Sequence, residues 1–564
     1  MKKTMWAVLV VAAVASLARA QVLPDKKAPS FSRADSLRGM WSPERSWYDI
    51  TYYDLDVRVD PAKRWIGGSN TIKFRVVEPH KRLQIDLFEN MNIETITLDG
   101  TDSLAFSREF HAVFVDILRA LEKNSNHELK VTYSGNPKVA ARPPWEGGFT
   151  WTQDKEGNPW VAVTCQGTGA SLWWPNKDHQ ADEPDSMAIR VTVPPGLQDI
   201  SNGRLRRVVA LPDGWNRYEW FVSYPINNYN VTVNIGKFAH FAETHRGETE
   251  LTLDYYVMPY DLEKARKQFQ QVGPMMECFE KRFGPYPFVR DGFKLVQCPH
   301  LGMEHQSAVA YGNDFLQGYR GRASSPVGLK FDFIIIHESA HEWWGNSVTS
   351  KDIADMWIHE SFGAYAEAVY VECLFGYEQA LAYVNGKKPN VRNQEPIIGI
   401  YGVNNKGSGD MYDKGQLVLN TLRHVVNDDS LWFSMIRALA MKFRYQTIMA
   451  EDVFGLINKM TAQDFTSLFD QYFRHATIPT LRVSVTATGD TTTVRYRWVA
   501  EADGFAMPID VFVGDQAMVR LFPTQQWKAY SVLGLDPKEF DVATDRFYVD
   551  VRKSLTYLDP ARPD

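Results

Sequence analysis

The stretch His337-Glu338-Ser339-Ala340-His341-Glu342-Trp343-Trp344-Gly345-Asn346 contains the pattern H-E-x-x-H. It continues an apolar run at residues 331–336, and together the two segments predict a buried helix. On a helix, His337 and His341 are four positions apart and project from one face, so both imidazoles can bind one metal ion. Glu338 lies beside that face, close enough to take a proton from water without binding the metal. The stretch therefore predicts a catalytic metal site.

A catalytic zinc ion usually has three protein ligands and one open position. Glu360 follows His341 after 18 intervening residues, a gap that lets one helix end near Asn346 and a second return a carboxylate to the histidine face. Two neutral imidazoles and one carboxylate leave a bound zinc ion positively charged, which lowers the pKa of its water to about 7. His359 is another candidate for the third metal ligand. Because consecutive residues on a helix project about 100° apart, His359 and Glu360 do not share one face, and we take Glu360 as the ligand. We therefore expect His337, His341 and Glu360 to bind one Zn²⁺ per chain.

The alternative interpretation of H-E-x-x-H is a pair of surface histidines on a helix. The preceding apolar run and the spaced glutamate argue against it. Glu342 and Glu367 are candidates for accepting the second N–H group of a ligand histidine, as carboxylates near metal sites commonly do. The alternative for each residue is a charged side chain exposed to solvent on the surface of a helix.

The composition is that of a soluble globular protein, with 564 residues, 44% hydrophobic and 23% charged. A net charge of −6 argues against a nucleic-acid or anionic-membrane partner. Residues 1–20 combine Lys2 and Lys3, a short apolar run and a small-residue ending, which predicts a signal peptide and an exported protein, periplasmic or secreted. A buried N-terminal helix is the alternative. No later apolar run is long enough to predict a membrane span.

The four cysteines are Cys165, Cys278, Cys298 and Cys373. Their wide spacing matches neither a disulfide framework nor a zinc-binding pattern. Export would permit disulfides, but the spacing leaves their existence open. We interpret most of the four as small buried hydrophobic residues.

Hydrophobic periodicity divides the chain. Residues 21–45 are polar and predict a linker or extended arm, and residues 46–250 alternate apolar and polar residues, as Tyr53, Leu55, Val57 and Val59 do, which predicts a β-rich domain. Residues 251–477 show mostly helical spacing, with expected helices at 262–283, 331–344, 361–374, 415–426 and 450–460. A Gly- and Asn-rich connection at 385–410 predicts a lid or binding loop. Residues 478–564 return to strands around Gly-Asp turns, which predicts a small β-sandwich.

Several motifs, in the same order along the chain, resemble the aminopeptidase N family of zinc peptidases, which are gluzincins. The segment 337–346 together with Glu360 resembles the family's zinc signature, and Gly302-Met303-Glu304-His305 resembles its Gly-x-Met-Glu-Asn motif. Tyr412-Asp413-Lys414-Gly415 resembles its Tyr-Glu-Lys-Gly motif, and Cys165-Gln166-Gly167 resembles the segment of its N-terminal domain that reaches into the active site. The likeness runs from about residue 46 onward. It implies a multidomain α+β fold with a thermolysin-like, mostly helical catalytic domain.

The resemblance also implies roles for individual residues. Glu304, with Gln166 as a second acceptor, would bind the free α-ammonium group of a peptide through charge-assisted hydrogen bonds. Tyr412 would donate a hydrogen bond to the developing oxyanion, and Gly302 and Met303 would line the path of the peptide backbone. With Glu338 as general base toward a zinc-activated water, the expected function is removal of the N-terminal residue from peptides. We expect the enzyme to be a monomer.

The sequence departs from the family pattern at three points. His305 stands in place of Asn, Asp413 in place of Glu, and the chain ends without the helical C-terminal domain that many relatives carry. The last departure predicts a more open cleft and weaker restriction on peptide length. Three alternatives stay open: an endopeptidase with the same zinc chemistry, an epoxide hydrolase like one specialised relative, and a non-catalytic peptide-binding protein of the periplasm.

Overall fold

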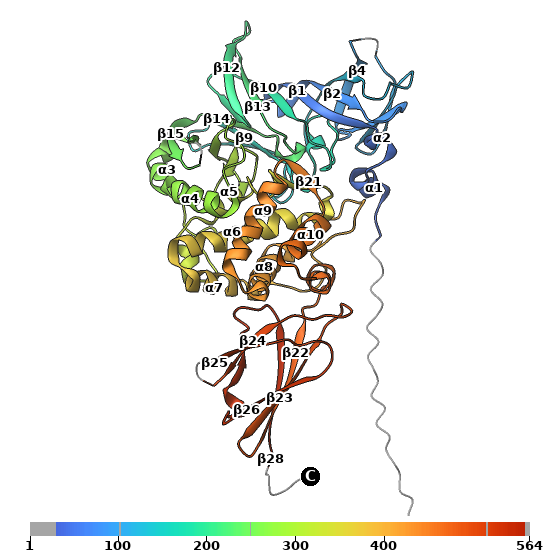
Figure 1. The fold of residues 1–564 in the computed structure, drawn as a ribbon. Helices are drawn as coiled ribbons and strands as arrows, with labels where there is room; N and C mark the ends of the chain where they lie inside the picture. Colours follow the sequence, from blue (N-terminus) through green and yellow to red (C-terminus); the bar gives the residue numbers. More distant parts are fainter. Residues whose placement is uncertain (1–29, 101–102, 249, 515–516, 559–564) are drawn as a thin grey trace, which may run out of the picture.

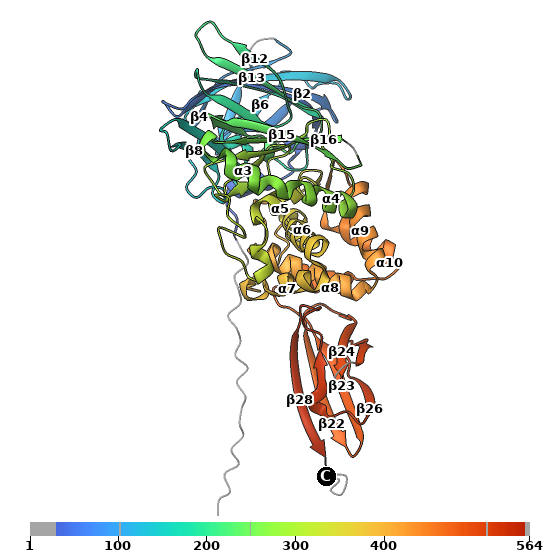
Figure 2. The same ribbon diagram turned by 90° about the vertical axis from the view of Figure 1, so that its left-hand side faces the viewer.

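The computed structural model describes residues 30–100, 103–248, 250–514 and 517–558 (Figure 1). The expected signal peptide lies outside the described residues, as does Asp515 of one expected turn. Three regions follow one another in space: an N-terminal group of sheets, a helical middle region and a C-terminal group of strands (Figures 1 and 2). Among the described residues, no helix is both long and apolar enough to cross a lipid bilayer.

The segment expected as a linker or arm contains two short helices from residue 33 onward, α1 (Arg33–Gly39) and α2 (Pro43–Ser46). Ser32 caps α1 in a capping box with Asp35. Arg45 is fully buried, donates to three backbone carbonyls of the α1 region, and forms an ion pair with Asp86 at 2.5 Å. These bonds fasten the segment to the N-terminal sheets, because they compensate much of the cost of burying a guanidinium.

The N-terminal sheets have seven, four and three strands, in the orders β12-β13-β10-β1-β2-β7-β4, β11-β14-β9-β8 and β3-β6-β5. The strands are β1 (Tyr48–Asp60), β2 (Trp65–Val76), β3 (Arg82–Asp86), β4 (Met91–Leu98), β5 (Phe106–Glu109), β6 (Ala112–Asp116), β7 (Asn126–Gly135), β8 (Gly148–Gln153), β9 (Pro159–Thr164), β10 (Ser186–Val193), β11 (Gln198–Ser201), β12 (Arg204–Ala210), β13 (Asn216–Val222) and β14 (Val233–Gly236). The alternation along β1 buries Tyr53, Leu55, Val57 and Val59 completely. Apolar faces of all three sheets share one core.

The middle region begins with a five-stranded sheet in the order β15-β16-β17-β19-β18. Its strands are β15 (Ala239–Arg246), β16 (Glu250–Val257), β17 (Phe293–Gln297), β18 (Gly302–Met303) and β19 (Val309–Tyr311). β15 pairs with β16 from Ala239 to Arg246 and therefore belongs to this sheet, ahead of the predicted domain boundary at residue 250. The alternation of apolar and polar residues is the same in both sheets, so the sequence did not indicate where one sheet ends and the next begins.

Helices cover this sheet and carry most of the region: α3 (Leu262–Gln268), α4 (Val272–Phe283), α5 (Phe333–Ala340), α6 (Trp357–Phe375), α7 (Tyr377–Asn385), α8 (Asp413–Val426), α9 (Asp429–Lys442), α10 (Ala450–Thr461) and α11 (Thr466–Phe469). α6 is buried from Trp357 to Val371 and packs against α4, α5, α7 and α8 (Figure 1). A helix that is buried all round belongs in the middle of a domain, and α6 occupies that place even though it carries Glu360 and Glu367. α5 ends earlier than the expected helix, although His341 still has helical φ and ψ of −64° and −17°.

The C-terminal strands form a four-stranded sheet, β26-β23-β22-β28, and a three-stranded sheet, β25-β24-β27. They are β22 (Thr480–Thr488), β23 (Thr491–Val499), β24 (Ile509–Val513), β25 (Ala517–Leu521), β26 (Lys528–Leu533), β27 (Phe540–Val542) and β28 (Asp550–Leu558), coloured red in Figure 1. Leu481 and Val485 of one sheet and Val511 of the other belong to the same buried core as the helices. This shared core joins the last strands to the middle region.

A disulfide bond joins Cys278 on α4 to Cys373 on α6, with 6.1 Å between the Cα atoms. These two cysteines therefore do not conform to the interpretation as simple buried hydrophobic residues, whereas Cys165 and Cys298 are free and buried. The bond closes a loop of 95 residues and links the central helix to the helix that flanks it. A crosslink over such a long loop restricts the unfolded chain strongly.

We expect the Cys278→Ala/Cys373→Ala double variant to lose about 2–4 kcal/mol of stability and several degrees of apparent Tm. Calorimetry with and without reductant checks this prediction. Reductant should lower the Tm of the native protein and leave that of the double variant unchanged. Equal Tm values for the native protein in both buffers would contradict a stabilising role of the disulfide.

Candidate active site

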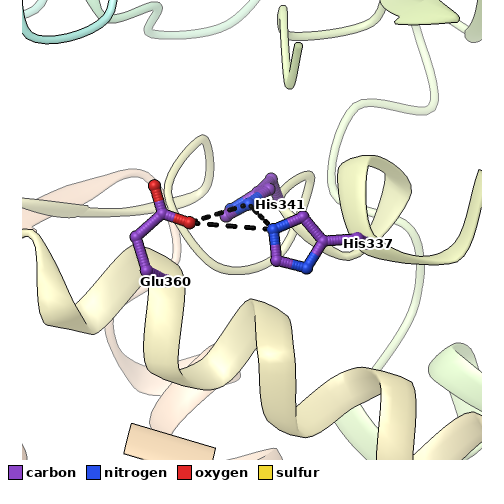
Figure 3. Close-up of side chains that lie close together, drawn as sticks. All are labelled: His337, His341 and Glu360. Atoms are coloured by element: carbon purple, nitrogen blue, oxygen red, sulfur yellow. Dashed lines mark hydrogen bonds and ion pairs between the residues drawn. The ribbon is translucent and has the colours of Figure 1, made fainter. Parts of the chain in front are cut away.

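The three expected metal ligands come together at the junction of α5 and α6 (Figure 3). His337 Nε2 lies 3.4 Å from His341 Nε2 and 3.7 Å from Glu360 Oε2, and His341 Nε2 lies 3.5 Å from the same carboxylate oxygen. Ligand atoms about 2.1 Å from a tetrahedral zinc ion are about 3.4 Å apart from one another. The three atoms therefore have the spacing that a zinc ion requires, and the donor set is that of a catalytic site.

The outer nitrogen of each histidine ring has a hydrogen-bond partner. His341 Nδ1 lies 2.8 Å from the carbonyl oxygen of Trp344, and His337 Nδ1 lies 2.7 Å from Glu367 Oε1. A carbonyl oxygen only accepts, so His341 carries its proton on Nδ1 and its Nε2 lone pair points to the centre of the site. Such partners fix ring orientation and increase ligand basicity.

Glu367 is held in place by further contacts and is almost completely buried. Its second oxygen accepts from the Tyr383 hydroxyl at 2.6 Å and from Lys387 Nζ at 3.3 Å. Glu367 is therefore hydrogen-bonded to a candidate ligand histidine and is not a solvated helix charge. Tyr383 and Lys387 were not identified from the sequence, since no motif or local spacing connects them to the site.

Glu342 and His359 lie near the site but outside the ligand cluster. Glu342 accepts from the Tyr286 hydroxyl and from the Ser307 amide, both at 2.8 Å, so it braces the segment after Glu304 and bonds neither ligand histidine. His359 Nε2 accepts from the amide of Ser350 at 2.8 Å. Both therefore organise the backbone around the site.

Glu304 lies at the end of β18 with only 2% of its surface exposed. Gln166, from the N-terminal region, donates through Nε2 to Glu304 Oε1 at 2.5 Å and to Glu360 Oε1 at 3.0 Å. Burial, together with the carboxylates of Glu360 and Glu338, raises the pKa of Glu304 well above its usual value. A cationic group placed among these acids would relieve their mutual repulsion.

Among the described strands, β18 is at the edge of its sheet and pairs with β19 alone, through Gly302–Tyr311 and Met303–Ala310. A Cβ atom on Gly302 would lie 2.7 Å from Ile334 and 2.9 Å from Glu338 Oε1, so only glycine fits there. The strand therefore runs directly beside Glu338. An extended peptide can pair with such a free edge.

Tyr412 precedes α8, and its ring centroid lies 6.1 Å from that of His337. Burial and the nearby carboxylates of Glu360 and Glu304 raise the pKa of Tyr412 well above its usual value, so the hydroxyl keeps its proton and can donate. Lys414 and Gly415, which belong to the same motif as Tyr412, have structural roles. Lys414 donates to the carbonyl of Ala476, and a Cβ on Gly415 would lie 2.0 Å from Ser361 Oγ.

A cavity of 580 Å³ contains all nine residues predicted from the sequence, which line it together. They are Gln166, Gly302, Met303, Glu304, His337, Glu338, His341, Glu360 and Tyr412. Burial raises the pKa of Glu338 to about 7, partly opposed by His337. The structure thus brings the candidate ligands, base, amine-binding groups and tyrosine into one chamber.

His305, which departs from the family pattern, does not line this cavity. It is completely buried, and within the described residues neither ring nitrogen has a hydrogen-bond partner. Burial lowers the pKa of His305 to about 3, so the ring is neutral. This departure from the family pattern therefore lies outside the wall of the cavity.

Comparison with known proteins places this geometry in context. A model described as "Peptidase family M1 domain" matches residues 267–472, and one described as "Peptidase M1 N-terminal domain" matches residues 50–229. The chain is 24% identical to aminopeptidase B of Mus musculus over 454 residues, which covers 72% of this chain and 65% of the relative. It is 23% identical to endoplasmic reticulum aminopeptidase 1 of the same species over 333 residues, which covers 57% of this chain and 35% of the relative. The chain thus spans less than two thirds of these relatives' length.

A solved structure of an M1 zinc metallopeptidase from Deinococcus radiodurans, a mutant bound to a Tyr-Ser-Ala substrate, has a TM-score of 0.65 to this structure. The sequences are 18% identical, and the match covers 79% of this chain and 98% of that chain. At this identity the likeness shows a shared fold. The two family models together account for most of the sequence and include every residue of the predicted site, and the chain belongs to peptidase family M1.

Proposed function

We propose that this protein is a zinc-dependent aminopeptidase that removes the N-terminal residue from peptides. One observation carries the proposal: side-chain atoms of Glu304, Glu338 and His341 all lie within 4.8 Å of one another. In a peptide, the terminal nitrogen and the first carbonyl carbon are only about 2.5 Å apart, since two bonds join them. An ammonium group bound to Glu304 therefore brings the first peptide bond beside the cluster of His337, His341 and Glu360.

The residues of the cavity can divide the reaction among them. When bound, zinc supplies Lewis-acid chemistry, lowering the pKa of water and polarising a carbonyl group. Glu338 acts as general base toward water and then protonates the leaving amine. Tyr412 donates its hydroxyl to the oxyanion that develops on the first carbonyl oxygen. The free edge of β18 at Gly302 and Met303 holds the peptide extended.

The named relatives support this proposal. Aminopeptidase B and endoplasmic reticulum aminopeptidase 1 carry the activity in their names, as does leucyl aminopeptidase of Saccharolobus solfataricus, 25% identical over 342 residues. That match covers 58% of this chain and 42% of the relative. An endopeptidase would need room beyond the first residue, where Gln166 and Glu304 are hydrogen-bonded to each other. This contact favours an exopeptidase.

We infer export to the periplasm or the medium from the basic and apolar N-terminal residues. We infer that residues 478–564 form a β-sandwich, which is supported by the common core of the two C-terminal sheets. We infer a monomer with one zinc ion: His337, His341 and Glu360 supply the three protein ligands of a catalytic zinc site, and the second cluster among the described residues, Glu304, Glu338 and His341, shares His341 with it.

The first prediction tests the anchor for the amine. The enzyme should hydrolyse alanyl and leucyl amides and lose at least about tenfold in kcat/KM on their N-acetyl forms, because acetylation removes the charge that Glu304 binds. Glu304→Ala should raise KM for the free amines by a similar factor. Steady-state kinetics on both series measures this. Equal cleavage of acetylated and free substrates would instead identify an endopeptidase.

The second prediction concerns Glu338. Glu338→Gln should lower kcat by about 10²–10⁴-fold because the base is lost. Zinc content, measured by elemental analysis, should stay at that of the native enzyme. Glu378→Gln, at an exposed position on α7, serves as the matched control and should behave as native. Near-native turnover of Glu338→Gln would contradict the assignment of the base.

The third prediction concerns Glu367. Glu367→Gln should weaken zinc affinity by about 10–100-fold, since the His337 ring loses its charged partner. Glu342→Gln removes another buried carboxylate that contacts no ligand histidine and should leave affinity near native. Competition with a chromogenic chelator, on variants whose circular dichroism is native, measures both. Similar losses in the two variants would show a general effect of burying an amide.

A further inference from the structure

α1 belongs to a segment that precedes the residues matched by either family model. The match to the M1 N-terminal domain begins at residue 50, whereas α1 spans Arg33–Gly39. On one side, Arg33 Nε lies 3.0 Å from Glu109 Oε1 on β5. On the other side, a Cβ atom on Gly39 would lie 2.1 Å from the carbonyl carbon of Val403, so a larger residue would force the two segments apart. α1 therefore contacts both the N-terminal sheets and the middle region (Figure 1).

Gln166 belongs to a tight turn that directly follows β9. The amide of Thr168 donates to the carbonyl of Cys165 at 3.0 Å, and the amide of Gly169 donates to the same carbonyl at 2.7 Å. Gly167 is the third residue of the turn and has a φ of +70°, which suits glycine. Cys165 is completely buried, which fixes the first end of the turn. The position of Gln166 therefore depends on what holds the other end, at Thr168.

Arg38 of α1 holds that end. Its Nη1 donates to the carbonyl of Thr168 and lies 3.5 Å from Asp178 Oδ2, and its Nε donates to Asn404 Oδ1 at 3.2 Å. A Cβ atom on Gly169 would lie 2.0 Å from Arg38 Nη1, so the guanidinium lies directly against the backbone of the turn. One planar group thus joins three segments, which the single nitrogen of a lysine cannot do with the same geometry.

The Arg38 side chain also lines two cavities beside the turn. The smaller has a volume of 40 Å³, enough for water, and is lined by Gln166 and Tyr229 as well. The larger has a volume of 380 Å³ and is lined by Phe110, which is 51% exposed, so it is open to solvent. Both cavities share the lining residues Arg38, Gly167, Asp178 and Asn404. Truncation of Arg38 would therefore leave a gap that a small solute can reach.

We propose that Arg38 is a positioning residue for the amine-binding site and acts through Gln166. The inference rests on the proposed aminopeptidase function. Gln166 Nε2 donates to Glu304 at 2.5 Å and to Glu360 at 3.0 Å, so a shift of its turn disturbs the carboxylate that would bind the substrate ammonium. Glu338 lies on α5, whose apolar residues are packed in the core of the middle region. Loss of Arg38 should therefore impair substrate binding more than turnover.

The test measures kcat and KM for leucine amide and for its N-acetyl form. Arg38→Ala should raise KM for the free amine by about tenfold, as expected for lost charge-assisted hydrogen bonds, and should leave kcat close to native. The preference for the free amine over the N-acetyl form should fall by the same factor. Zinc content and the circular dichroism spectrum should match those of the native enzyme.

Three controls isolate the guanidinium. Arg33→Ala removes the same charge from the same helix but from an exposed ion pair with Glu109, and it should have native KM. Arg38→Lys keeps the charge with one nitrogen and should recover part of the affinity. Ethylguanidinium reproduces the atoms that Arg38→Ala removes. At millimolar concentration it should lower KM of that variant toward native, relative to its effect on the native enzyme, whereas ethylammonium should not.

Native KM in Arg38→Ala would overturn the inference, and so would equal losses on the free and acetylated substrates, since these would indicate general damage to the fold. A similar rise of KM in Arg33→Ala would assign the effect to the net charge of α1. If ethylguanidinium fails to lower KM, or ethylammonium lowers it equally, the contacts of the guanidinium are not the cause. Failure of the aminopeptidase function itself is distinguishable, because the native enzyme would then not prefer leucine amide over its acetylated form.

Discussion

The close approach of α6 to α5 is the constraint on which the site depends. Gly363, one turn after Glu360, allows it: a Cβ atom there would lie 2.9 Å from the His341 ring. On the opposite flank, Gly415 allows α8 to approach Ser361 equally closely. Because α6 is buried on all sides, any displacement would disturb packing on several neighbours at once. The fold therefore fixes the third ligand by packing, before any metal binds.

Electrostatics explains why such a site needs cations. Glu304, Glu338, Glu360 and Glu367 are all at least nine-tenths buried, and isolated carboxylates are costly in such surroundings. Lys387 and the outer nitrogen of His337 compensate Glu367. Within the part of the chain that the structure describes, the other three acids face the cavity without a lysine or arginine as close as Lys387 is to Glu367. In the proposed function, a metal dication and a substrate ammonium supply the missing positive charge, and the same preformed field would favour binding of both.

Local sequence patterns predicted those features that are local in the chain. The spacing of His337 and His341, the alternation along β1 and the helical periods around Glu360 all follow from the geometry of one helix or strand. The pairing of Gln166 with Glu304, the Cys278–Cys373 bond and the contact of Arg38 with Thr168 depend on segments that meet only after folding. The resemblance to family motifs identified Gln166 and Glu304 as candidate site residues, but it did not predict that they are hydrogen-bonded to each other. The resemblance implied that Gln166 accepts a hydrogen bond from the substrate, whereas in this structure its side-chain amide donates to two carboxylates.

The N-terminal segment shows how distant parts of the chain support one cavity. Arg38 of α1 donates to the carbonyl of Thr168, two residues after Gln166, and its Nε donates to Asn404 at 3.2 Å. The amide of Asn404 donates in turn to the carbonyl of Asp35 at 3.1 Å. One short helix thus ties the loop that carries Gln166 to the connection at 385–410, which leads into Tyr412. The sequence predicted a lid or a binding loop in that connection. These bonds fasten it to the N-terminal segment, and its residues Lys387 and Asn390 line the cavity. Because the proposed amine-binding residue Gln166 and the proposed oxyanion donor Tyr412 come from different regions of the chain, a common support for both keeps their separation constant.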